Sequence, residues 1–215
     1  MKVIITGATG MVGEGVLIEC LENEMVTEIL MVNRKTSPVK HPKLKELLIP
    51  DFMRPDGYED DLTGYDACFY CAGISSVGMK EEKYTLITYD TTIAFAAKLA
   101  SLNPDMVFSF VSGSHTDSTE NGRIMWARVK GRTENALMKL PFKKAYNFRP
   151  GFMKPFKEQK NIKSFFKPLI AIFPVLFPKR SLTMKQVGQA MINTVRKDYP
   201  KQILEIEDIK ALAAL

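Results

Sequence analysis

The sequence predicts an α/β fold in which a doubly wound parallel sheet carries helices on both faces. Short runs of β-branched and other apolar residues alternate with longer stretches whose apolar residues recur at helical spacing. A glycine-rich turn stands directly between the first run and the first helical stretch. Such alternation is typical of repeated β-α-β units, whose crossovers are nearly always right-handed. One domain is expected from 215 residues.

The first part of the chain predicts four strands and one helix. Lys2–Thr6 is a β-branched run that ends at the glycine-rich turn. A helix is expected to begin near Met11, because apolar residues recur there with a period of about 3.6. Glu28–Asn33 is a second apolar run, and residues 46–49 and 67–71 predict the third and fourth strands.

The middle of the chain continues the alternation. Residues 80–102 predict a long helix with apolar side chains on one face, and residues 106–111 predict the fifth strand. A further helix is expected over 125–139 and a sixth strand over 145–148. Six strands with intervening helices suffice for a Rossmann-type sheet.

The glycine-rich turn is the strongest functional motif. Gly7 permits a tight turn, Gly10 lets a phosphate approach the backbone, and Gly13 allows the helix to pack closely against the strand. The free N–H groups of the helix N-terminus favour an anion. A dinucleotide site is therefore predicted at Gly7, Thr9, Gly10, Met11, Val12 and Gly13. The alternative is a purely structural turn.

The end of the second strand bears on the choice of dinucleotide. NAD sites place an acidic residue about 20 residues past the glycines, to bind the ribose 2′-hydroxyl. Here Asn33, Arg34 and Lys35 occupy that place. A guanidinium can fork onto a 2′-phosphate, so NADP(H) is favoured over NAD(H). The alternative is a solvated basic turn.

Several motifs together resemble a known superfamily. They are the opening Thr6-Gly7-Ala8-Thr9-Gly10, Cys71-Ala72-Gly73 after the fourth strand, Val111-Ser112-Gly113-Ser114 after the fifth and Arg149-Pro150-Gly151 after the sixth. This pattern is similar to the short-chain dehydrogenase/reductase superfamily. Lys130-Gly131 with Glu134 narrows it to atypical, NAD(P)-dependent epimerase/dehydratase-like members, near the Tat-interacting oxidoreductase-like proteins.

The resemblance implies a catalytic Ser, Tyr and Lys, with tyrosine four residues before lysine. Lys130 matches the lysine, which also binds the cofactor, but Trp126 stands at the tyrosine position. Indole N–H donates a hydrogen bond but exchanges no proton near neutral pH. Ser112 and Ser114 both flank the serine position. The resemblance also sets Asp51 beside the adenine, while the small Ala72 and Gly73 are expected along the cofactor.

The missing tyrosine leaves three interpretations open. The chain is an inactive NADP(H)-binding regulatory or scaffold protein, or His115 supplies the proton, or hydride transfer proceeds with little acid catalysis. The function expected from the resemblance is that of an oxidoreductase or epimerase/dehydratase acting on a small molecule. Whether the chain is an active enzyme is left open.

Residues beyond Gly151 change in character. The stretch 152–180 is irregular and rich in Lys, Phe and Pro. Thr183 is then followed three residues later by Gln186, which predicts a helix opened by a capping box. The chain is read as one NAD(P)-binding domain, 1–215, with a cofactor core over 1–151. Residues 152–215 then form a small C-terminal elaboration, a substrate-side lid with a terminal helix.

The net charge of +6 is unevenly distributed. Residues 139–185 contain 12 Lys and Arg residues against Glu158 alone, so that window carries +11 and the rest of the chain −5. The basic residues are interleaved with Phe152, Phe156, Phe165, Phe166, Phe173 and Phe177. The stretch 152–180 predicts either a solvated lid or contact with a membrane surface or an anionic ligand. Nucleic acid is the weakest alternative, and a homodimer is the default assembly.

Cysteine usage and targeting signals favour a cytoplasmic protein. Three cysteines form no disulfide framework, and Cys68 and Cys71 fall on one strand, where positions three apart face opposite sides. We expect them to be core residues and not a redox pair. Two histidines make no metal site. The apolar stretch 162–178 contains lysines and prolines, so it is a poor membrane span.

Overall fold

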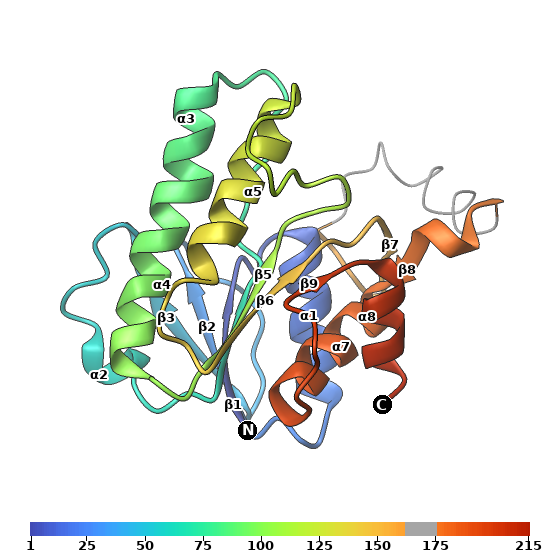
Figure 1. Ribbon diagram of the computed structural model, residues 1–215. Helices are drawn as coiled ribbons and strands as arrows, with labels where there is room; N and C mark the ends of the chain where they lie inside the picture. Colours follow the sequence, from blue (N-terminus) through green and yellow to red (C-terminus); the bar gives the residue numbers. More distant parts are fainter. Residues whose placement is uncertain (162–175) are drawn as a thin grey trace.

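The computed structural model describes residues 1–161 and 176–215 and contains a seven-stranded sheet (Figure 1). The strands are β1 (Lys2–Thr6), β2 (Glu28–Asn33), β3 (Leu44–Leu48), β4 (Ala67–Tyr70), β5 (Val107–Val111), β6 (Lys144–Phe148) and β9 (Ile203–Leu204). Their order is β3-β2-β1-β4-β5-β6-β9, and every neighbouring pair is parallel. The chain reverses its direction of travel across the sheet between β1 and β4, the switch point at which ligands bind in such folds. The predicted doubly wound fold is confirmed.

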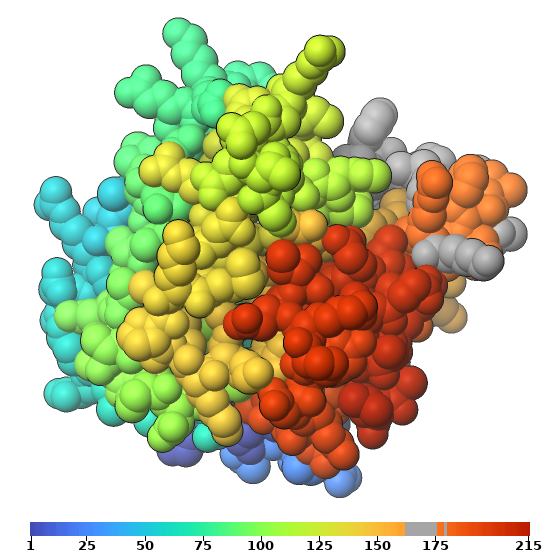
Figure 2. Space-filling view, viewed as in Figure 1, coloured from blue at the N-terminus to red at the C-terminus, as the bar shows by residue number. Residues whose placement is uncertain are grey.

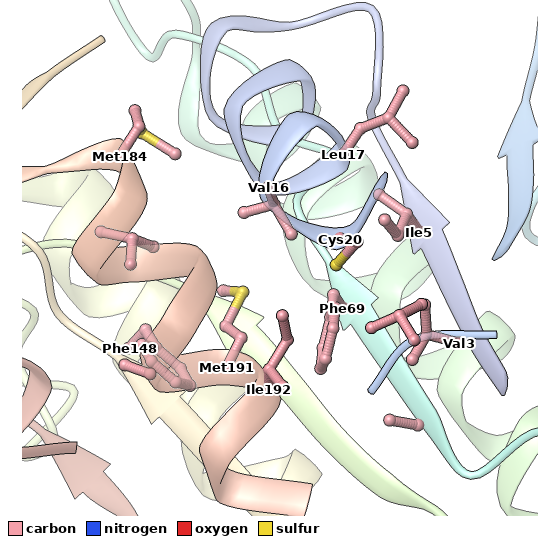
Figure 3. Packing of buried hydrophobic residues seen from close by; sticks show 14 of the residues in the cluster. Val3, Ile5, Val16, Leu17, Cys20, Phe69, Phe148, Met184, Met191 and Ile192 are labelled. Carbon is pink, nitrogen blue, oxygen red and sulfur yellow. The ribbon is translucent and has the colours of Figure 1, made fainter. Parts of the chain in front are cut away.

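Helices cover both faces of this sheet (Figure 1). One layer is formed by α1 (Met11–Glu22), α7 (Met184–Arg196) and α8 (Ile206–Ala213). The other contains α2 (Glu59–Leu62), α4 (Thr91–Leu102) and α5 (Met125–Leu137). The two layers bury separate apolar clusters because alternate strand residues point to opposite faces. Figure 3 shows Val16 of α1 and Met191 and Ile192 of α7 packed toward Phe69 of β4.

The cysteines follow the predicted alternation. Cys68 is buried in one cluster, whereas Cys71 packs against the other together with buried Cys20. Burial raises the pKa of the Cys68 thiol far above its usual range and that of Cys71 to about 12. Because the reactive form of cysteine is the thiolate, both residues act as core side chains.

The predicted long helix is present but is not uniformly α-helical. It runs through α3 (Glu81–Thr85), a π-helical turn η1 (Leu86–Asp90) and then α4. At this turn the Thr91 backbone N–H and the Thr91 hydroxyl both donate to the Leu86 carbonyl oxygen, five residues back. Apolar periodicity does not distinguish such a turn from an ordinary α-helical one, so the sequence prediction missed it.

Two strand predictions need adjustment. β3 begins at Leu44, two residues earlier than expected, because its ladder with β2 starts at Ile29 and includes the charged residues Lys45 and Glu46. β9 was not predicted, since its two residues are strand only through pairing with Asn147 and Phe148 of β6.

The C-terminal part of the chain completes the core. A short parallel pair links β7 (Phe152–Lys154) to β8 (Ser181–Thr183), with η3 (Pro178–Arg180) just before β8. The Thr183 hydroxyl accepts from the Gln186 backbone N–H while the Gln186 side chain accepts from the Thr183 N–H, which confirms the predicted capping box. Figure 2 shows the C-terminal elements continuous with the remaining surface. β9 is therefore an edge strand of the sheet, and α7 and α8 lie in the helical layer on one of its faces.

Candidate functional site

A cavity of about 270 Å³ opens at the carboxyl ends of the central strands. Its wall joins the loop before α1, the segments following β4 and β5, and single residues from η1 and α5. The lining residues are Gly10, Met11, Val12, Cys71, Ala72, Gly73, Ile74, Thr88, Phe110, Val111, Ser112, Gly113, Lys130, Pro150 and Met153. It thus brings together residues that the sequence analysis took from five separate motifs.

The glycine loop is packed tightly on its inner side and open on its outer side. Gly7 has φ +69°, and a Cβ there would stand 2.6 Å from the Ala72 backbone nitrogen. A Cβ on Gly13 would lie only 2.2 Å from the Gly7 oxygen, so helix α1 sits directly against the turn. Gly10 is exposed, caps α1 without a side-chain hydrogen bond and has room for a Cβ. The cradle that Gly10 leaves open, at a helix N-terminus, fits a pyrophosphate.

The carboxyl end of β2 presents cations to solvent. Asn33 is buried, while Arg34 and Lys35 are exposed. Glu46 of β3 contacts the turn that follows β2: its Oε1 accepts from the Ser37 backbone N–H at 2.7 Å and the Asn33 amide at 3.4 Å. Thus one oxygen of that carboxylate is already engaged by the turn that carries the two cations.

Asp51 lies in the turn that follows β3. It is exposed, and its Oδ1 accepts from the Met53 backbone N–H at 2.9 Å. It does not line the cavity. An adenine contact by Asp51 therefore remains a prediction.

Lys130 projects from α5 to the cavity wall. Its Nζ donates a hydrogen bond to the Ser112 carbonyl oxygen. Burial lowers the pKa of Lys130 to about 8, although the carboxylate of Glu134, one helical turn away, acts in the opposite direction. A lysine that is readily deprotonated near neutral pH is suited to proton transfer.

The Ser112 side chain belongs to a buried polar network. Its hydroxyl lies 2.5 Å from Glu134 Oε1 and 3.0 Å from the Phe148 carbonyl oxygen. Arg149 Nε and Nη2 also donate to Glu134, at distances down to 2.5 Å, and Arg149 Nη2 reaches Ser118. The hydroxyl hydrogen of Ser112 is therefore drawn toward protein acceptors and is not available to a molecule in the cavity.

The other predicted catalytic residues lie outside the cavity wall. His115 is exposed in a left-handed conformation with φ 69°, and the Ser114 backbone N–H donates to the Pro150 carbonyl oxygen. The Trp126 indole lies beside the end of β5, since a Cβ on Gly113 would stand 3.8 Å from its Cζ3. Roles for His115 and Ser114 remain predictions.

Thr88 is a cavity residue that the sequence analysis did not identify. It is 6% exposed and lies in the π-helical turn η1. A single threonine within a predicted helix carries no signal of its own, and only the packing of η1 against α5 brings it near Lys130.

The segment after β7 is fastened to α1. The Gln159 side chain donates to the Met11 carbonyl oxygen at 2.7 Å, and Glu14 accepts from the backbone N–H groups of Lys160 and Asn161, both at 2.8 Å. The start of the predicted lid is therefore attached beside the glycine loop.

The basic window is partly neutralised by acids from elsewhere in the chain. Lys144 pairs with Asp198, while Arg149 pairs with Glu134 and Glu205. Lys154, Lys157 and Lys160 are exposed. The predicted contributions of Lys163, Lys167, Phe165, Phe166 and Phe173 lie outside the described residues. Membrane or anionic-ligand contact through 152–180 and a homodimer remain predictions.

The described residues contain neither a cluster of metal-ligating side chains nor a membrane-spanning helix. No group of three or more His, Cys, Asp and Glu side chains is placed to hold a metal ion in the part of the chain that the structure describes. Across 1–161 and 176–215, no helix has both the length and the apolar character needed to cross a bilayer.

Comparison with protein families identifies the group to which this architecture belongs. Residues 3–134 match the NAD dependent epimerase/dehydratase family, a span of more than half the chain. The chain belongs to this family. The resemblance read from the glycine loop and the strand-end motifs is confirmed, and the family is one that binds NAD(P).

Curated relatives are distant. Protein HTATIP2 of Rattus norvegicus is 24% identical over 154 residues, covering 71% of this chain and 62% of the relative. Protein FMP52-2, mitochondrial, of Scheffersomyces stipitis is 28% identical over 150 residues, covering 69% and 65%. The chain thus spans less than two thirds of the length of either relative.

Solved structures share the fold. The Helicobacter pylori ADP-L-glycero-D-manno-heptose-6-epimerase has a TM-score of 0.71 at 13% identity, covering 99% of this chain and 80% of that one. The Methanobrevibacter ruminantium UDP-N-acetylglucosamine 4-epimerase gives 0.70 at 15%, covering 95% and 75%. MoeE5, in complex with UDP-glucose and NAD, gives 0.69 at 14%, covering 100% and 81%. At these identities the likeness establishes the fold alone.

Proposed function

We propose that the chain is an NADP(H)-dependent oxidoreductase of the epimerase/dehydratase family that acts on a small molecule. The observation that carries this proposal is that the open face of the Gly10 loop and Lys130 line the same cavity. When bound, the dinucleotide supplies or accepts a hydride. The remaining chemistry belongs to side chains of this chain: binding the dinucleotide, orienting the substrate and moving a proton.

The residues of the glycine loop fit a pyrophosphate. The backbone N–H groups at the start of α1, from Met11 and Val12 onward, have no side-chain cap and point toward the side left open by Gly10. Lys130 and the backbone of Ala72 and Gly73 stand farther along the same wall. This order along the cavity supports a dinucleotide that extends from β2 toward β5.

NADP(H) is the dinucleotide that we propose. Arg34 and Lys35 are exposed at the end of β2, where a 2′-phosphate is bound in folds of this type. A guanidinium forms stronger hydrogen bonds with a charged phosphate than with a neutral hydroxyl.

Calorimetric titration with NADPH and with NADH tests both parts of the proposal. NADPH is expected to bind at least about tenfold more tightly, a difference of about 1.4 kcal/mol. Arg34→Ala should weaken NADPH binding and leave NADH binding nearly unchanged. Lys2→Ala is the matched control, because Lys2 is an exposed cation at the amino end of β1, opposite to the carboxyl ends of the strands. Equal binding of both dinucleotides overturns the NADP(H) preference, and binding of neither overturns the function.

A second candidate is an inactive, NADP(H)-binding regulatory protein. Trp126 at the usual tyrosine position and the engagement of Ser112 by Glu134 favour it. The two candidates differ in turnover of NADPH with 4-nitrobenzaldehyde as a carbonyl probe. Turnover by the wild-type chain favours the oxidoreductase. Activity that appears only after Trp126→Tyr favours the inactive binder with an otherwise intact pocket.

A further inference from the structure

Thr88 has unused hydrogen-bonding capacity at the cavity wall. Its Oγ1 is buried and has no partner of regular hydrogen-bond geometry among the residues that the structure describes. The Tyr84 hydroxyl is close enough for a weaker side-chain hydrogen bond with Thr88, which partly offsets the rise that burial causes in the pKa of Tyr84. A buried hydroxyl without a regular hydrogen bond is costly, so its presence at a cavity indicates a group that binds there.

The π-helical turn sets the position of Thr88. Because Thr91 bonds to Leu86 five residues back, the helix from α3 to α4 contains one extra residue at this point. The turn packs against α5, the helix that carries Lys130. Such turns are frequent at functional sites, and here the turn lies at the wall of the candidate site.

Lys130 likewise has N–H donors that no described residue engages. An ammonium group has three N–H donors, and among the described residues it donates one hydrogen bond, to the Ser112 carbonyl oxygen. With its pKa lowered to about 8, the group can both donate and recover a proton in the neutral range. The Ser112 hydroxyl donates to Glu134, and the indole N–H of Trp126 is not acidic enough to transfer a proton near neutral pH, so neither competes for these roles.

The rest of the cavity wall restricts the substrate class. Among the described lining residues, Lys130 is the single charged side chain, and the others near it include Phe110, Val111, Ile74 and Met153. A wall of this composition suits an apolar body with one polar oxygen.

We propose that Thr88 and Lys130 together bind the reacting oxygen of a small apolar aldehyde, ketone or alcohol, with Lys130 as the proton donor. This inference rests on the proposed function and names its substrate class and its acid. In reduction, the carbonyl carbon accepts a hydride from the reduced dinucleotide, and the carbonyl π electrons move to oxygen. That oxygen takes a proton as one N–H bond of Lys130 breaks. An alcohol, oxidised dinucleotide and a neutral amine result, and the amine regains its proton from water.

Schiff-base trapping tests the contact without relying on turnover. The purified chain is incubated with 4-nitrobenzaldehyde and cyanoborohydride at pH 7, and adducts are assigned by peptide mass spectrometry. Lys130 should be labelled at least about tenfold faster than the exposed Lys80 and Lys139, because a larger fraction of it is neutral. Thr88→Val should slow labelling of Lys130 several-fold. Thr85→Val is the control, since Thr85 lies one turn away and outside this cavity.

Each outcome bears on the inference. Labelling of Lys130 no faster than that of the exposed lysines overturns it, as does equal labelling in Thr88→Val and wild type. In turnover assays with NADPH, the rate of reduction should fall as pH rises through about 8, because Lys130 must then be protonated to act as the acid. NADPH binding without selective trapping keeps the proposed function and rejects this inference. Selective trapping without NADPH binding supports the contact of Thr88 and Lys130 with the carbonyl group but rejects the proposed function, and with it the reduction step.

Discussion

Glu134 is the residue that organises the end of β5. Its carboxylate is fully buried and receives the Ser112 hydroxyl together with two guanidinium nitrogens of Arg149, whose side chain is 11% exposed. Burial opposes the charge of Arg149, but Glu134 and Glu205 outweigh it, so the pKa of Arg149 lies above its usual value. The network directs the Ser112 hydroxyl toward Glu134 at the cavity wall and holds β6 to α5.

Removing the charge of Glu134 should therefore be costly. Glu134→Gln removes the buried charged partner of Arg149 and leaves only the more exposed Glu205, so the free energy of unfolding should fall by about 3–5 kcal/mol in urea titrations. The control is Glu81→Gln, whose carboxylate is 51% exposed and pairs with Arg128 at 2.7 Å. That change should cost less than about 1 kcal/mol. Equal losses in the two variants would contradict this account of the network.

At this scale the sequence identified candidates but not their geometry. Lys130, Ala72 and Gly73 were predicted from motifs and do line the cavity. Ser112 and Ser114 were not distinguished in the sequence, because both follow the fifth predicted strand and both flank the expected serine position. What separates them is the contact of Ser112 with Glu134, 22 residues away, which no local pattern encodes. Thr88 was missed for the same reason.

At the scale of elements, the first β-α turn has two distinct sides. Gly13 is required by packing, since its Cβ would lie 2.2 Å from the Gly7 oxygen. Gly10 meets no such limit: its φ of −102° suits any residue, and a Cβ would stand 3.4 Å from the same oxygen. The two glycines thus serve different purposes, one in folding and one in leaving room for a ligand.

Alanine substitutions should separate these purposes. Gly13→Ala should lower the free energy of unfolding by about 1–3 kcal/mol or more, through overpacking against the turn. Gly10→Ala should change stability by less than about 1 kcal/mol but weaken NADPH binding at least about tenfold. Thermal unfolding and calorimetry measure the two effects. A Gly10→Ala variant that binds NADPH normally would show that no pyrophosphate approaches this residue.

The elements themselves were largely predictable where local patterns sufficed. β1, β2 and the α7 capping box follow from β-branched runs and a Thr–Gln pair at the right spacing. β3 and β9 depend on partner strands, and η1 depends on the contact with α5. These are tertiary effects, so periodicity within one segment does not reveal them.

At the scale of the whole molecule, α7 joins the C-terminal part of the chain to α1. The contact is close, because a Cβ on Gly188 of α7 would stand 2.6 Å from Glu19 Cβ. Glu19 is 4% exposed, and its Oε2 makes no hydrogen bond with the residues that the structure describes. Burial raises the pKa of Glu19, with Glu22 adding to the effect and Lys185 and Gln189 opposing it.

This raised pKa gives a defined dependence of stability on pH. The folded chain binds the Glu19 proton more tightly than the unfolded chain, so this contribution is present at low pH and is lost as pH rises above 4.5, the usual value. Glu19→Gln should therefore raise the free energy of unfolding at pH 7, with the gain shrinking as pH falls toward 4.5. Glu22→Gln, at an exposed position on the same helix, should change it little. A Glu19→Gln variant less stable than wild type at pH 7 would contradict this assignment.

The cavity depends on features of all three scales: the β1–β4 switch point, the glycine loop and two side chains from different helices. A crystal structure of the chain with NADPH tests that account most directly. The pyrophosphate is expected at the N-terminus of α1, the 2′-phosphate at Arg34, and the nicotinamide in the cavity with its reactive edge facing Thr88 and Lys130. A dinucleotide bound elsewhere, or a cavity still empty at saturating NADPH, would contradict it.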